Sequence, residues 1–249
     1  MTDETEGLPD IHVSWDRAFR LIRSIHPPID LFEDIADPCD WEALASVESK
    51  TNPRLVESMG RIDLVPVERR VSGPGASYAM APFVHCSPDR PGRFTDGRYG
   101  VYSAGDSEEV ALREVAFHHA RLMRATAEKA GWHSQFRMLA GGIDRVFVDL
   151  RDRADCHDPD DWSTPQALAA QLRRQGADGV HYRSVRCPGG LCIGAFWPDA
   201  VGLPVQGDHF ELHWDGAQVD RVLNRRTMRE FALTPILPVA KRWGGGARR

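Results

Sequence analysis

The sequence lacks the features that mark membrane proteins and nucleic-acid-binding proteins. No run approaches the ~20 apolar residues that span a bilayer. Residues 1–10, MTDETEGLPD, are acidic and contain no apolar segment of the kind found in signal peptides. The formal net charge of −5 leaves no basic excess for contact with nucleic acid. We therefore expect a cytoplasmic protein that contacts no membrane and makes no direct contact with nucleic acid.

Paired cysteines and common catalytic motifs are also missing. The cysteines number five and none forms a C-x-x-C pair, which argues against a disulfide framework and against a zinc site. The chain contains no G-x-S-x-G elbow, no P-loop, no G-x-G-x-x-G after a strand and no H-E-x-x-H. His118 and His119 are adjacent, so their rings would point in different directions on a helix. We expect reduced thiols, ordinary surface or core histidines, and no resident metal or cofactor.

What the chain does contain suits one α/β domain. An apolar content of 42% in 249 residues is enough for a sizeable core, and no repeat or internal linker divides the chain. We expect a disordered tail at residues 1–13, a domain at residues 14–240 and a flexible tail at residues 241–249. Within the domain, residues 14–85 would form a helical N-terminal elaboration and residues 86–215 would carry the core motifs.

The spacing of apolar residues, helix caps and turn residues predicts the elements. Residues 14–23 have helix-like spacing or lead into a strand, and residues 79–84 suit either a strand or a helix. Ser163 and Gln166 suit a capping box at the start of a helix that Gly176 ends. The other expected elements are a helix within residues 38–55 that Asp40 caps, strands at residues 136–139, 146–150, 180–182, 191–196 and 209–214, and a hairpin turn at Asp215-Gly216.

The stretch at residues 92–119, GRFTDGRYGVYSAGDSEEVALREVAFHH, is the most informative part of the chain. It predicts a glycine-rich loop, a short strand and a helix that Asp106 or Ser107 caps and that continues towards Lys129. The expected inward stripe of this helix comprises Val110, Ala111, Val115, His118 and Leu122. Glu114 lies beside this stripe, where a carboxylate is paired, at the solvent edge or functional.

A second stretch suits contact with an anion. Ser184 lies between two arginines in a loop bordered by Gly and Pro, which suits either a phosphate-contacting loop or a solvated charged loop. Together with Ser184, the residues Arg93, Tyr102 and Glu114 indicate a binding site more strongly than each does alone. Arginine binds diphosphate, tyrosine stacks on an aromatic ring, and a carboxylate suits ribose hydroxyls or a cationic sugar. As a set, these residues fit a dinucleotide cleft.

Two runs resemble the signatures of the RES domain family. The run GRFTDGRYGVYSAGDSEEVALRE resembles the first signature, which reads G-R-W/F, then Y-x-A, then A-x-x-E. The run GADGVHYRSVRCPGGLCIGAFWPD resembles the second, in which the serine is followed by a strand that ends in F-x-P. The resemblance covers roughly residues 19–215 and is to the longer subgroup of the family.

This resemblance implies an α/β (α+β) fold like that of ADP-ribosyltransferases, with a mixed sheet core and flanking helices. It implies a bacterial toxin that cleaves the nicotinamide–ribose bond of NAD by hydrolysis or phosphorolysis, so that NAD is a substrate and not a cofactor. It also implies an antitoxin partner with an Xre-like helix-turn-helix region, and it is compatible with a homodimer. The alternatives are transfer of ADP-ribose to a protein at the same site and a non-catalytic interaction module on this fold.

The resemblance also assigns roles to individual residues. The site residues that it implies are Arg20, Arg93, Tyr102, Glu114 and Ser184. Glu114 would stabilise the oxocarbenium-like transition state, and Arg93 would hold the diphosphate with the help of Arg20. Tyr102 would stack on nicotinamide or shape its pocket, and Ser184 would hydrogen-bond the ribose or the carboxamide. The acceptor is water, phosphate or a protein side chain.

Overall fold

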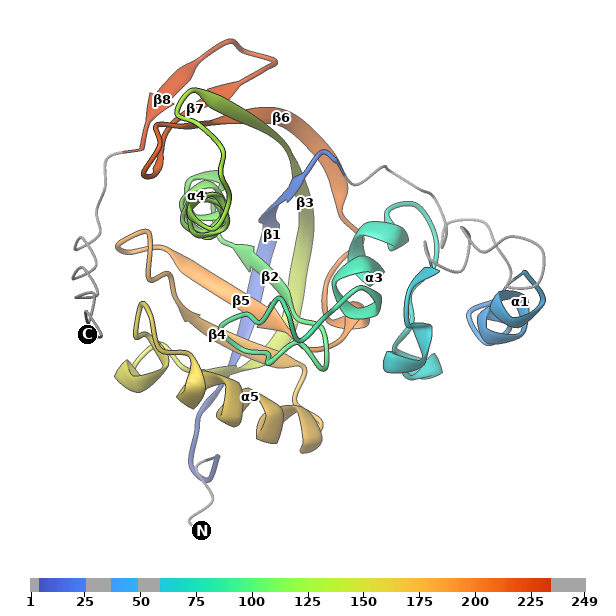
Figure 1. Ribbon diagram of the computed structural model, residues 1–249. Coiled ribbons are helices and arrows are strands. Elements are labelled where there is room, and N and C mark those ends of the chain that lie inside the picture. The colour runs from blue at the N-terminus through green and yellow to red at the C-terminus, as the bar shows by residue number, and fades with distance from the viewer. Residues whose placement is uncertain (1–4, 26–36, 49–58, 234–249) are drawn as a thin grey trace, which may run out of the picture.

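The computed structural model describes residues 5–25, 37–48 and 59–233, and its strands form an eight-stranded mixed sheet (Figure 1). The strands are β1 (Asp10–Arg23), β2 (Tyr102–Gly105), β3 (Trp132–Asp149), β4 (Gly179–Arg183), β5 (Leu191–Ala195), β6 (Val205–Trp214), β7 (Val219–Asn224) and β8 (Glu230–Ala232). Their order is β1-β2-β5-β4-β3-β6-β7-β8. The β3–β4 pair is parallel and the other described pairs are antiparallel. This mixed sheet with flanking helices confirms the predicted α/β class.

The long strand β3 joins two parts of the sheet. One edge of β3 pairs with β1 along most of its length, and the other edge pairs with β6 near its start and with β4 at its end. Because β1 also meets β2, the strands β1, β2, β5, β4 and β3 form a closed circuit, from which β6, β7 and β8 extend. Tyr102, Phe147 and Ile193, contributed by three strands of the circuit, are buried together in one apolar cluster.

The helices cover the sheet from several sides. The described helices are α1 (Trp41–Glu48), α3 (Ala76–Val84), α4 (Glu108–Arg124), α5 (Ser163–Arg174) and the short 3₁₀ helices η1 (Ile62–Leu64), η2 (Val67–Arg69), η3 (Ala154–Cys156) and η4 (Pro198–Ala200). α4 lies in the hollow of the curved sheet, with β6 and β7 arching over it and β2 and β5 on its other side (Figure 1). Each of three helices packs in its own apolar cluster. Met123 of α4 packs with Phe210, and Leu168 of α5 packs with Val180. Met80 of α3 packs with residues of the strand circuit.

The N-terminal part of the chain corrects two expectations. Residues 10–13, expected in a disordered tail, and residues 14–23, assigned to a helical elaboration, together form β1, which pairs with β3 along its length. The register shifts between Trp15 and Ala18, and both side chains contact the same apolar cluster. A β-bulge therefore places residues three apart on one face, and this spacing imitates the period of a helix. The described part of residues 37–85 contains short helices joined by irregular segments, and residues 241–249 lie outside the described residues.

Two further local expectations are corrected in part. Residues 136–139 and 146–149 are extended as predicted, but they belong to one strand, β3, which continues through the two glycines at residues 141–142 and ends at Asp149. Ser163 is the first residue of α5 and caps nothing, because Trp162 occupies the cap position without a side-chain hydrogen bond. The Gln166 side chain instead donates to the backbone oxygen of Gly92 at 2.9 Å, which attaches α5 to the glycine-rich loop.

The remaining elements follow the predictions closely. The apolar run at residues 79–84 lies in α3, and α4 begins after Ser107 but ends at Arg124, before Lys129. Gly176 follows α5 with a φ of +89°, and Gly216 has a φ of +100° in the turn between β6 and β7. The strands expected near residues 180, 191 and 209 correspond to β4, β5 and β6, and the helix expected within residues 38–55 corresponds to α1. Among the described helices, none combines the length and apolar character that a bilayer crossing requires.

Candidate active site

Glu114 is presented by α4, whose first turn is well capped. Ser107 adopts an extended backbone and its hydroxyl accepts a hydrogen bond from the backbone N–H of Val110 at 3.3 Å. The face of α4 that is buried differs in part from the predicted stripe. The buried residues are Val110, Ala111, Leu112, Ala116, His119, Ala120 and Met123. His118 and Leu122, predicted to point inward, are exposed, and Glu114 lies half-buried at the edge of the packed face.

Ser184 lies at the start of the loop between β4 and β5 and is 9% exposed. The loop is closed by a hydrogen bond from the Ser184 backbone N–H to the Gly190 oxygen at 2.9 Å. The Ser184 hydroxyl accepts hydrogen bonds from the backbone N–H groups of Arg186, at 3.2 Å, and Cys187, at 2.9 Å. Its hydrogen is then donated to Oε1 of Glu114 at 2.6 Å. Two residues 70 positions apart in the sequence are thereby joined by a hydrogen bond to a charged acceptor.

Cationic and aromatic side chains surround this pair. The Arg186 guanidinium lies 3.2 Å from the centroid of the Phe117 ring and donates to the backbone oxygen of Pro159 at 2.6 Å. Burial lowers the pKa of Arg186 to about 10, and the negative charge of Glu114 opposes this shift. Arg121, on the same helix as Glu114, lies over the Trp162 ring at 4.9 Å. The charges of Arg93, Arg121 and Arg186 all act in this region, and they favour an anionic ligand.

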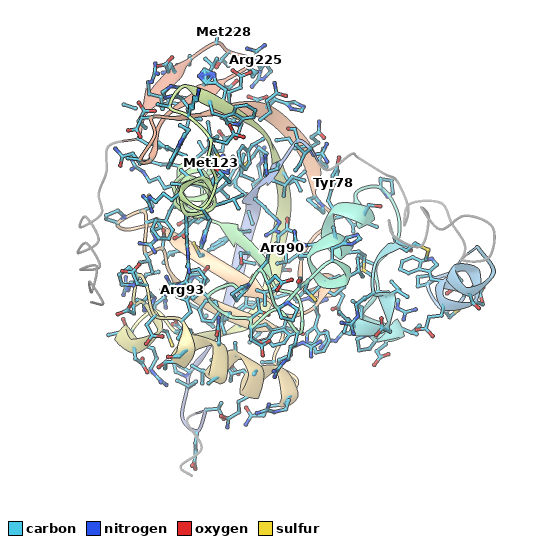
Figure 2. The ribbon with its side chains drawn as sticks, in the orientation of Figure 1. Tyr78, Arg90, Arg93, Met123, Arg225 and Met228 are labelled. Carbon is cyan, nitrogen blue, oxygen red and sulfur yellow. The ribbon has the colours of Figure 1, made fainter. Side chains whose placement is uncertain are left out.

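Arg93 connects this region with a neighbouring cavity. Its guanidinium donates to the backbone oxygens of Cys156, at 3.1 Å, and Asp158, at 2.7 Å, and lies 5.9 Å from the centre of the Trp162 ring. In Figure 2, Arg93 lies between α4 and α5, and Arg90 lies nearer to α3. Charges on Arg93 and Glu114 both act on the pKa of Arg186, so Arg93 lies within electrostatic reach of the Glu114–Ser184 pair.

The cavity has a volume of about 270 Å³, slightly below the ~300–1,000 Å³ that is usual for ligand pockets. Its walls come from β1, the end of α3, the glycine-rich loop and β2. Arg20, Arg90 and Arg93 line it, and none of its lining residues is acidic. The loop bends sharply at Gly97, which has a φ of +88° and whose Cα lies so close to the backbone of Ser87 that a side chain would collide with it. A cavity with three arginines among its lining residues suits a phosphate-bearing ligand.

Tyr102 lies beneath Arg20 and not in the lining of the cavity. Its side chain is 2% exposed and does not line the cavity. Arg20 lies over the Tyr102 ring at 4.9 Å and donates to the backbone oxygen of Ser103 at 2.9 Å. Burial raises the pKa of Tyr102 to about 12, and the Arg20 charge opposes this shift. Since the ring is covered, Tyr102 supports Arg20 in this structure and offers no free face to a nicotinamide ring.

The five predicted residues therefore form two adjacent groups. Glu114 and Ser184 form the hydrogen-bonded pair, and Arg20, Tyr102 and Arg93 form the wall of the cavity and its support. Four residues that the sequence reasoning did not select complete the site. They are Arg90, Arg121, Trp162 and Arg186. Two of them carried a local signal. Arg186 is one of the two arginines that border Ser184 in the predicted anion-contacting loop. Arg121 lies seven residues after Glu114 and thus near the same face of α4.

The site contains no cluster of the kind that holds a metal ion. Within residues 5–25, 37–48 and 59–233, no group of three or more His, Cys, Asp or Glu side chains is arranged to bind one. All five cysteines carry free thiols. Three of them, Cys156, Cys187 and Cys192, are buried.

Comparison with known proteins identifies the family. The profile of the RES domain matches residues 67–215, more than half of the chain, and the protein therefore belongs to the RES domain family. This match includes Arg93, Tyr102, Glu114 and Ser184 but not Arg20. The uncharacterized protein y4oC of Sinorhizobium fredii (strain NBRC 101917 / NGR234) is 29% identical over 206 residues, which are 82% of this chain and 85% of y4oC. The crystal structure of the M. tuberculosis MbcT–MbcA toxin–antitoxin complex is similar over 82% of this chain and 87% of that chain, at 14% identity and a TM-score of 0.42.

Proposed function

We propose that this protein is a toxin that consumes NAD by cleaving its nicotinamide–ribose bond, and that a cognate antitoxin neutralises it. Membership of the RES domain family supports the proposal. The observation that carries it is the hydrogen bond between Ser184 and Glu114, beside a cavity lined by arginines. A fixed carboxylate next to a phosphate-binding wall is the arrangement that this reaction needs, because positive charge develops on the ribose while the diphosphate stays bound.

Glu114 is the group that opposes the developing charge. As nicotinamide leaves, the ribose ring acquires oxocarbenium character, and a carboxylate that is already in place stabilises that charge without reorganisation. Ser184 holds one carboxylate oxygen of Glu114, since its only hydrogen is donated there and its lone pairs accept from two backbone N–H groups. The second carboxylate oxygen is then free to face the ribose.

The arginines hold the diphosphate. Arg20 and Arg93 have their guanidinium groups oriented by backbone oxygens, which reduces the freedom that they lose when a ligand binds. Arg90 is exposed at the same cavity and supplies a third positive charge. Tyr102 acts through Arg20 in this account, because its buried ring supports that guanidinium.

The test is incubation of the purified protein with NAD, with and without inorganic phosphate, followed by identification of the products. Release of nicotinamide supports the proposal. ADP-ribose as the second product indicates water as the acceptor, and ADP-ribose 1″-phosphate formed only when phosphate is present indicates phosphorolysis. ADP-ribose found on a protein would instead indicate a transferase, and unchanged NAD at high protein concentration would contradict the proposal.

The antitoxin part of the proposal has its own test. Expression of the protein alone is expected to lower cellular NAD and arrest growth, because an enzyme that consumes NAD must be restrained in its own host. Co-expression of a neighbouring gene for a helix-turn-helix protein is expected to restore growth and to give a complex that co-purifies. A neighbour that neither binds nor relieves toxicity would contradict this part alone.

A further inference from the structure

His157 lies in the segment at residues 150–162, between β3 and α5, and the mechanism above does not use it. Its ring makes two hydrogen bonds, through Nε2 with the backbone N–H of Arg183 at 3.1 Å and through Nδ1 with the backbone oxygen of Arg153 at 2.7 Å. Because a backbone N–H only donates and a carbonyl only accepts, Nδ1 carries the hydrogen and Nε2 carries none. The ring is therefore neutral, and burial favours this state by lowering the pKa of His157.

The bond to Arg183 lies where the pairing between β3 and β4 stops. β4 pairs with β3 at two residues, and β3 ends at Asp149. Beyond this point, the backbone N–H of Arg183 donates to the His157 ring instead of to a strand. A strand N–H without a partner is costly, so this bond fixes the end of β4. Ser184, the next residue, is therefore held through the backbone that precedes it.

The same segment also holds Arg93. The backbone oxygens of Cys156 and Asp158, on either side of His157, accept hydrogen bonds from the Arg93 guanidinium at 3.1 Å and 2.7 Å. The neighbours of His157 thus orient the arginine that would bind the diphosphate, while its ring holds the backbone before Ser184. One residue therefore connects the two groups of the candidate active site.

Other contacts between the segment and Arg183 are weaker. The Arg183 guanidinium donates to the backbone oxygen of Arg151 at 2.9 Å and to the carboxylate of Asp152 at 3.0 Å. The Asp152 side chain is 94% exposed, and ion pairs in such positions contribute little. These contacts also involve a long side chain, which leaves the backbone of Arg183 free to move. The bond to the half-buried His157 ring acts on the backbone itself.

We propose that His157 is a positioning residue, which holds Ser184 in register with Arg93. Ser184 presents the Glu114 carboxylate and Arg93 binds the diphosphate, so this register decides whether the carboxylate faces the ribose. The inference rests on the proposed function, since it assigns His157 to the same reaction without contact with the substrate. Loss of the bond to Arg183 should lower kcat, because the ribose and the carboxylate are then out of line. KM should change little, because Arg93 keeps both of its backbone partners.

Three substitutions at residue 157 separate the two hydrogen bonds of the ring. His157→Gln places an amide oxygen near the position of Nε2, where it still accepts from Arg183. His157→Asn places an amide nitrogen near the position of Nδ1, so it keeps only the bond to Arg153. His157→Phe keeps a ring beside Tyr182 and neither bond. We expect kcat for nicotinamide release to fall about tenfold in the Asn and Phe variants and to stay within about threefold of the parent in the Gln variant, since displacement of a catalytic group by ~1 Å costs up to about 100-fold.

Hydrogen exchange at the backbone amide of Arg183 gives a second readout, which does not depend on activity. This amide should exchange faster in the Asn and Phe variants than in the parent and remain protected in His157→Gln, because protection is lost with the hydrogen bond. Asp152→Ala is the matched control, since it removes the exposed ion pair of the same segment with Arg183 and leaves the bond to His157 in place. It should change neither kcat nor the exchange of this amide.

The outcomes distinguish this inference from the proposed function. If His157 only closes the turn after η3, the Asn variant should keep kcat and the Gln variant should lose it. That order, or equal kcat in the two variants, overturns the positioning role, while cleavage of NAD by the parent leaves the proposed function standing. If His157→Phe does not fold, the Gln and Asn variants give the same decision. A parent that leaves NAD intact overturns the proposed function and the catalytic role of His157 together, and amide exchange then still decides whether His157 holds the end of β4.

Discussion

At the scale of single residues, the Ser184 hydroxyl has one hydrogen to donate and gives it to Glu114. Ser184→Ala removes this hydrogen bond to a charged group, a type of bond worth about 1.5–3 kcal/mol. We therefore expect kcat to fall roughly 10- to 100-fold, with little change in KM. Ser163→Ala is the control, since Ser163 is an exposed serine whose side chain caps no helix. A Ser184→Ala protein with the parent kcat would show that Glu114 needs no such support.

Arg90 is expected to act in binding rather than in chemistry. It is exposed at the mouth of the cavity, next to Arg20 and Arg93, so its charge attracts the diphosphate in the ground state and in the transition state alike. Arg90→Gln should raise KM for NAD several-fold and leave kcat unchanged, as for loss of uniform binding. Arg98→Gln is the control on the same loop, because Arg98 does not line the cavity. Steady-state kinetics measure both variants. If Arg90→Gln and Arg98→Gln gave the same KM for NAD, Arg90 would have no role in binding.

Only part of the site was accessible from the sequence. Glu114 and Ser184 were selected because they match a family signature, since helical spacing alone left Glu114 undecided between pairing, exposure and function. The roles of Arg186 and Trp162 depend on contacts between α4 and two separate loops, which no local pattern encodes. Tyr102 was predicted to stack on nicotinamide or to shape its pocket because its residue type suits both roles, and the covered position of its ring follows only from the closed strand circuit.

At the scale of elements, the N-cap of α4 determines where the helix begins and therefore where Glu114 lies along it. Ser107 satisfies the backbone N–H of Val110, and loss of such a cap costs about 1 kcal/mol. Ser107→Ala should lower the free energy of unfolding by that amount, and Ser107→Asp, which keeps an accepting oxygen at the cap, should preserve it. Denaturant titration measures both. Equal stability of Ser107→Ala and the parent would show that the cap contributes nothing.

Element types were predicted where local chemistry decides them. Gly176 and Gly216 end their elements with positive φ, and Ser107 caps α4, because these features depend on a few adjacent residues. β1 was ambiguous because its bulge between Trp15 and Ala18 gives strand residues the spacing of a helix. Its identity is settled by pairing with β3, which lies more than 100 residues away in the sequence, and no window of the chain contains that information.

At the scale of the whole molecule, buried histidines make stability depend on pH. Burial lowers the pKa of His119 to about 4, and the charge of Arg23 lowers it further. His119 is 5% exposed and its Nε2 has no hydrogen-bond partner, so the folded state keeps the ring neutral. The unfolded chain binds a proton near pH 6.5. Above pH 6.5, His119 therefore costs the folded state nothing. As the pH drops from 6.5 to 4, protonation of His119 in the unfolded chain lowers the free energy of unfolding by roughly 3 kcal/mol in total.

His119→Leu tests this dependence. The variant should lose less stability than the parent between pH 7 and pH 4.5, because the unfolded state no longer gains a proton at this position. His12→Gln is the control, since His12 is exposed on β1. Thermal unfolding at both pH values gives the comparison, and a drop in Tm identical to that of the parent would contradict the assignment.

The central claim is that the negative charge of Glu114 drives cleavage of NAD, and Glu114→Gln tests it most directly. Gln keeps the shape of the side chain and its ability to accept from Ser184, but removes the charge that opposes the oxocarbenium. Loss of a preorganised electrostatic group typically costs about 10²–10³ in rate. The account predicts a Glu114→Gln protein with a Tm near that of the parent and nicotinamide release slowed by that factor. A folded Glu114→Gln protein that releases nicotinamide at the parent rate would contradict it.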